Sequence, residues 1–100
     1  MKIQISKCDV DVTDALRVHV ERRLGLALAR FADRIGRVTV RFSHADGGAP
    51  GGNKRCQIEV GLRPGRLDVE DIDVDLFAAL NHATDRASRS VARALELGLR

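Results

Sequence analysis

Four basic side chains fall on one face of the helix predicted over residues 75–97. At about 100° per residue, steps of four, three and four hold them within roughly 60° of arc. They are His82, Arg86, Arg89 and Arg93. The opposite face is apolar and carries Leu76, Leu80, Ala83, Ala87, Val91, Ala94 and Leu95. Such a stripe could bind phosphates while its back is fixed to a core, and a solvated helix face is the alternative.

A second basic flank is predicted on the helical segment that begins after Thr13. His19, Arg23 and Arg30 recur there at spacings of four and seven, which suits phosphate contact better than general-base catalysis. No cysteine, serine or histidine lies in a recognisable nucleophile motif. We therefore expect a non-enzymatic protein with no cofactor, no metal and no small-molecule substrate.

Two other segments could hold ligands but have simpler explanations. The acidic run from Asp68 to Asp75 lacks the central glycine and terminal glutamate of a calcium loop, so helix capping and a solvated edge are favoured. The segment 45–53 has four glycines but no Lys-Ser/Thr ending, and it is predicted to be a flexible hairpin connection.

The two cysteines, Cys8 and Cys56, have no metal-like spacing. In a cytoplasmic protein they are expected to be buried or half-buried thiols rather than a disulfide, and a metal or redox function is the disfavoured alternative. The cytoplasmic expectation rests on two absences. No stretch approaches 18 apolar residues, and the first residues alternate instead of forming a leader, so no membrane partner is expected.

Length and composition favour one domain over residues 1–100, since 100 residues with 44% hydrophobic content suit one core. The net charge is modest: seventeen basic minus fourteen acidic residues give +3. The acids concentrate at 68–75 while the final helix is basic. The distribution of charge, more than its total, permits a basic binding face.

Alternating apolar residues predict strands over 2–6, 37–43, 55–63 and around 67–69. Helical periodicity predicts one segment from Thr13, its cap, to Gly36, and another starting near Val74 with Asp73 or Asp75 as its cap. Every strand and helix has one apolar side. This order predicts an α+β, two-layer β-α-β-β-β-α fold, with both helices packed on one face of a four-stranded mixed sheet.

The other face of the predicted sheet is left open to water. It carries Lys2, Gln4, Arg37, Thr39, Arg41, Arg55, Gln57 and Glu59. No aromatic residue lies among them, so this face is not a platform on which RNA bases would stack.

Short stretches along the chain, in order, carry a family resemblance. They are Lys2–Ser6, Val12–Leu16, Arg22–Leu24, Ile35–Val38, Asp75–Leu80 and Asp85–Arg89. Together they resemble the ribosome hibernation-promoting factor family, which includes the ribosome-associated inhibitor A. The resemblance implies a fold like that of double-stranded-RNA-binding domains, and a stress protein that docks on the small ribosomal subunit and inhibits translation without chemistry.

The resemblance also implies which residues contact rRNA phosphates. The candidates are Arg22, Arg23 and Arg30 on the first helix and Arg86, Arg89 and Arg93 on the second. Arg22 points furthest from the others. The chain looks like a short form of the family, without the C-terminal domain by which long forms pair ribosomes.

Departures from the family pattern leave a second function open. Phe77 stands where the family commonly has tyrosine, and Ala87 and Ser88 replace a bulkier apolar residue and an acid. A divergent relative could instead be a protein-interaction module that does not bind ribosomes. It would use the acidic edge at 68–75 or the exposed flank that carries Leu26.

Overall fold

The computed structural model describes residues 1–6 and 9–98 and has the predicted order of elements. No helix within these residues is long and apolar enough to cross a membrane. The elements are β1 (Lys2–Ile5), α1 (Asp14–Leu28), the 3₁₀ helix η1 (Ala29–Arg34), β2 (Ile35–His44), β3 (Lys54–Leu62), β4 (Arg66–Asp73) and α2 (Leu76–Gly98).

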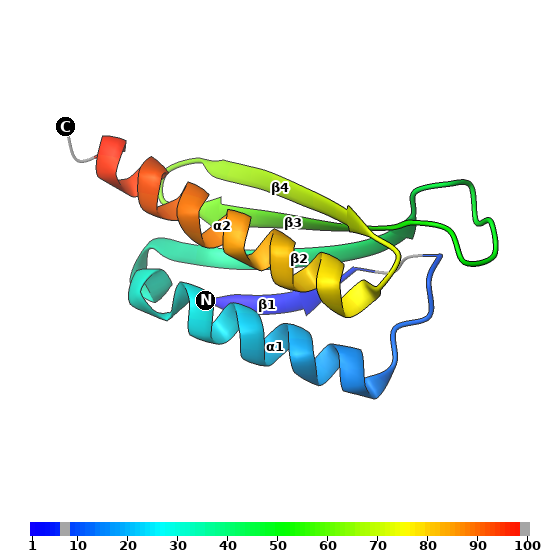
Figure 1. Cartoon of the computed structure of the whole chain (residues 1–100). Coiled ribbons are helices and arrows are strands. Elements are labelled where there is room, and N and C mark those ends of the chain that lie inside the picture. The colour runs from blue at the N-terminus through cyan, green and yellow to red at the C-terminus, as the bar shows by residue number, and fades with distance from the viewer. Residues whose placement is uncertain (7–8, 99–100) are drawn as a thin grey trace.

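The four strands form one mixed sheet in the order β1-β2-β3-β4. β1 pairs parallel with β2, and the β2–β3 and β3–β4 pairs are antiparallel, as predicted. Figure 1 shows α1 and α2 side by side on the same face of this sheet. The predicted α+β class and its two layers are confirmed.

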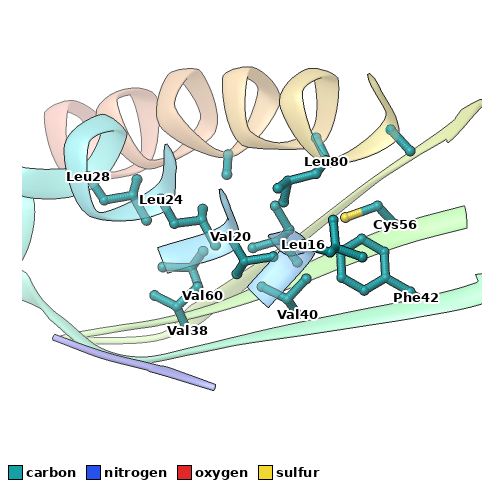
Figure 2. Close-up of a cluster of buried hydrophobic side chains, with 14 of the residues drawn as sticks. Leu16, Val20, Leu24, Leu28, Val38, Val40, Phe42, Cys56, Val60 and Leu80 are labelled. Atoms are coloured by element: carbon teal, nitrogen blue, oxygen red, sulfur yellow. The ribbon is translucent and has the colours of Figure 1, made fainter. Parts of the chain in front are cut away.

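The core lies between the sheet and the two helices, as Figure 2 shows. Helical spacing brings one side chain of α1 into it at every turn, and strand alternation brings in every second residue of β2 and β3. The fully buried residues include Leu16, Val20, Leu24, Leu28, Val38, Val40, Phe42, Cys56, Ile58, Val60, Leu80 and Val91. β4 adds Leu67 and Val69, which are partly buried and pack against this cluster.

Side-chain caps set where both helices begin. The Thr13 hydroxyl accepts a hydrogen bond from the backbone N–H of Leu16 at 3.1 Å, which confirms the predicted cap. Asp75 Oδ1 accepts from the backbone N–H of Phe77 at 2.9 Å. Asp75, one of the two predicted caps, is therefore confirmed, and α2 starts at Leu76, two residues after Val74.

The first helical segment ends differently from the prediction. α1 stops at Leu28 and passes into η1, a tighter turn that is common at helix C-termini. Gly36 lies inside β2, where the pairing register shifts between Ile35 and Val38. The expectation that Gly36 ends the helical segment is therefore wrong, because the helical turns end at Arg34 and β2 has already begun at Ile35.

Cys56 is a free thiol in the core, on the helix-facing side of β3. Burial, and secondly the charge of the neighbouring Asp71, raise its pKa from 9.0 to about 12. The thiol is therefore protonated at neutral pH and a poor nucleophile. This confirms the buried-thiol prediction for Cys56, whereas Cys8 lies outside the described residues.

Two leucines on the same helix provide a matched test of this packing. Leu24 is fully buried, whereas Leu26, two residues later, is 74% exposed. We expect Leu24→Ala to lower the free energy of unfolding by about 2–5 kcal/mol and Leu26→Ala to change it by less than about 0.5 kcal/mol. Urea denaturation measures both values, and equal effects would contradict the assigned core.

Candidate functional site

The helices α1 and α2 run parallel along a shared seam. His19 Nε2 hydrogen-bonds Asn81 Oδ1 at 2.9 Å near the start of the seam. Further along, the Ser88 hydroxyl donates to the carbonyl oxygen of Ala27 at 3.3 Å. Because residue numbers rise together on both sides, the C-terminal half of α1 lies next to the middle of α2, and Arg23 lies near Arg89 along the seam.

The basic stripe of α2 is exposed, as the helical pattern predicts. Its three arginines, together with Ser90, form one wall of a groove of about 420 Å³. The other wall is the segment 68–70 of β4. The stripe therefore lies along the edge strand of the sheet instead of standing alone in solvent.

A second groove, of about 400 Å³, follows the seam between the helices. Arg23 and Leu26 contribute to it from α1, and Asp85 and Arg89 from α2. Arg89 lines both grooves. Of the six arginines proposed from the sequence, the two grooves thus bring four together: Arg23, Arg86, Arg89 and Arg93.

The remaining two candidates lie outside both grooves. Arg22 is exposed on α1 and lines neither groove. Arg30 lies in η1, just after the end of α1. Its guanidinium carbon lies 4.6 Å from the ring centroid of Phe31, which is a cation–π contact. The grooves therefore do not bring Arg22 and Arg30 together with the other four candidates.

The charges of these arginines are compensated unequally. Asp71 Oδ2 accepts a hydrogen bond from His82 Nδ1 at 3.0 Å, and Asp71 Oδ1 lies 3.6 Å from Arg86 Nε. Arg23 Nη2 lies 3.5 Å from Asp85 Oδ1.

Arg89 and Arg93 differ from these neighbours. In the described part of the chain, neither has a carboxylate within ion-pair distance. An incoming phosphate therefore meets uncompensated charge at these two residues, while at Arg23 and Arg86 it competes with a carboxylate of the protein itself.

His19 does not join the basic flank that its spacing suggested. Besides its hydrogen bond to Asn81, its ring lies 5.1 Å from the ring of Phe77 on α2. His19 is thus a contact between the helices, and its predicted phosphate contact is not supported. The spacing along α1 alone could not show which flank α2 would cover.

Asp71 is the residue of this site that the sequence reasoning missed. β4 extends from Arg66 to Asp73, beyond the two inward residues predicted for it, and continues the alternation that begins with Leu67 and Val69. This alternation turns Asp71 toward the helices with its side chain only 18% exposed. The signal was present in the sequence, in the step of two from Val69.

The other acids of the 68–75 run also serve the fold. Glu70 pairs with Arg55 at 2.9 Å, and Asp73 accepts a hydrogen bond from the backbone N–H of Asp75, the cap of α2, at 2.9 Å. Capping by this run is therefore confirmed. Among residues 1–6 and 9–98, no group of three or more His, Cys, Asp or Glu side chains is arranged to hold a metal ion.

Comparisons with known proteins agree with this fold. The family model described as Sigma 54 modulation protein / S30EA ribosomal protein matches residues 3–96. The crystal structure of the Thermus thermophilus Protein Y N-terminal domain is 33% identical, with a TM-score of 0.76 over 93% of this chain and 98% of that one.

A ribosomal subunit interface protein from Coxiella burnetii is 18% identical, has a TM-score of 0.79 over 96% of this chain and 99% of its own, and shares the fold. No curated protein sequence gave a significant match. The family model nevertheless covers nearly the whole chain and confirms the resemblance seen in the sequence. The chain belongs to the Sigma 54 modulation protein / S30EA ribosomal protein family.

Proposed function

We propose that this domain binds the small ribosomal subunit through rRNA phosphates and inhibits translation by occupying space on it, as a hibernation factor under stress. The observation that carries the proposal is a pair of groove arginines with no carboxylate within ion-pair distance in the described residues: Arg89, which lines both grooves, and Arg93, which lines the groove against β4. Membership of a ribosomal protein family supports it. The proposed action needs no catalytic group. It needs only affinity for the subunit and enough volume to block it.

Counterion release sets the conditions under which this binding is tight. Six arginine–phosphate contacts give a slope of log K against log salt of about −4 to −5, or a several-hundredfold loss from 50 to 200 mM salt. With a net charge of only +3, strong binding requires RNA around more than one side of the domain. A short free duplex should therefore bind poorly.

The alternative, a protein-interaction module, finds less support. Its acidic edge is mostly used within the fold, since Glu70, Asp71, Asp73 and Asp75 all have the partners described above. Leu26 is exposed, but a single exposed leucine is common on protein surfaces. Neither feature identifies a partner protein.

Removing the charges of Arg89 and Arg93 tests the proposal. We expect Arg89→Gln/Arg93→Gln to weaken binding to small ribosomal subunits about tenfold, and to reduce the magnitude of the salt slope by about 1.4–1.8. The control Arg17→Gln/Arg63→Gln removes the same charge from exposed residues outside both grooves and should change binding little. Cosedimentation over a salt series measures both, and equal affinities for the two variants would overturn the proposal.

Asp71 should restrain binding, because it already compensates Arg86. Asp71→Asn preserves shape and removes the competing charge, so we expect it to tighten binding about two- to fivefold. Arg86→Gln should then cost more affinity in the Asp71→Asn background than in the wild type. A double-mutant cycle measured by cosedimentation gives the difference. An identical cost in both backgrounds would show that Asp71 does not compete for Arg86.

A further inference from the structure

The sheet face opposite the helices has its own distribution of charge. Strand register places its outward side chains in rows across the sheet. One row pairs Lys2 with Arg37. Two further rows contain Thr39, Glu59 and Asp68, and Arg41, Gln57 and Glu70. Lys2, Arg37 and Arg41 thus lie on the β1–β2 side, whereas the acids lie on β3 and β4 together with Arg55 and Arg66.

Two of the three acids on this face are already paired. Glu59 Oε2 lies 3.0 Å from Arg66 Nη1, and Glu70 Oε2 lies 2.9 Å from Arg55 Nε. Both pairs join neighbouring strands, β3 and β4. The acidic side of the face is therefore largely neutral, with Asp68 as its remaining carboxylate.

The basic side has no such compensation. Lys2, Arg37 and Arg41, the sheet cation strip, are exposed, and none has a carboxylate within ion-pair distance in the described residues. Arg37 and Arg41 are four residues apart on one strand, about 13 Å. Between them lies Thr39, whose hydroxyl accepts a hydrogen bond from Gln4 Nε2 at 3.4 Å. The strip is a row of positive charge separated by neutral polar groups.

We infer that the sheet cation strip is a second phosphate-binding surface, so that the domain is held between two RNA segments, one against each layer. The inference rests on the proposed function, which places RNA against the helices. A second binding surface would also explain how a domain with a net charge of only +3 can bind RNA strongly. In the described residues, cations without an ion-pair partner lie on both outer surfaces, while Glu59, Glu70 and Asp71 are each paired with a basic side chain, so binding does not depend on a high total charge.

An RNA backbone fits this strip better than an acidic protein does. Every outward position of β1 and β2 from Lys2 to Ser43 is charged or polar, so the strip lacks the apolar or aromatic centre typical of a protein interface. Guanidinium and ammonium donors suit phosphate oxygens, which need no apolar anchor. The face also lacks the aromatic residues needed for base stacking, which leaves the phosphates as its target.

The test compares three double variants on small ribosomal subunits. We expect Arg37→Gln/Arg41→Gln to weaken binding about fivefold or more and to reduce the magnitude of the salt slope by about 1.4–1.8, relative to the Arg17→Gln/Arg63→Gln control. Circular dichroism and urea denaturation establish that all variants are folded. The helix-layer variant Arg89→Gln/Arg93→Gln is measured in parallel.

The outcomes separate this inference from the proposed function. Weakening by both the strip and the helix variants supports binding between two RNA segments. If only the helix variant weakens binding, the inference is overturned and the proposed function stands. If only the strip variant does, RNA lies on one layer and the two-sided arrangement is overturned. If neither differs from the control, both proposals fail.

A cross-linking measurement identifies what covers the strip. A photoreactive benzoylphenylalanine placed at Thr39, between the two arginines, should form adducts with rRNA when the bound complex is irradiated. Adducts with ribosomal proteins alone would overturn the inference, because the strip would then face an acidic protein.

Discussion

The fold depends on one packing constraint: a four-stranded sheet with a single apolar face must be covered by two helices at once. Four strands spaced about 4.8 Å apart give a width that two helices, about 10 Å apart, fill side by side. The helices therefore share a seam, with Ser88 against Ala27 and His19 against Asn81. This packing brings arginines from distant parts of the sequence to neighbouring grooves.

The same constraint distributes the charges. On β4, beneath α2, Asp71 contacts His82 and Arg86. Across the antiparallel β3–β4 pair, Glu59 and Glu70 form ion pairs with arginines of the neighbouring strand. These three acids are thus paired within the fold, while in the described part of the chain Arg37, Arg41, Arg89 and Arg93 have no carboxylate within ion-pair distance. For a protein with a net charge of +3, this partition determines which surfaces attract phosphate.

Local patterns in the sequence predicted the elements and most of the core. The Thr13 cap depends on residues within one helical turn, and the inward side chains of β2 follow from alternation, so both were predictable. Contacts between elements were not predictable from such local patterns. The engagement of His19 with Phe77 depends on where α2 lies, and the place of Gly36 depends on a register shift against β3. The exposed arginine stripe was predictable, but its compensation by Asp71 required the packing of α2 on β4.

In the proposed complex, Arg89 and Arg93 contact rRNA phosphates while the domain occupies the small ribosomal subunit. An experimentally determined structure of the domain bound to that subunit tests this most directly. We expect phosphate oxygens within hydrogen-bonding distance of both guanidinium groups, with RNA along the grooves that Arg89 lines. A complex in which the helix layer faces solvent, or in which both arginines contact only protein, would contradict it.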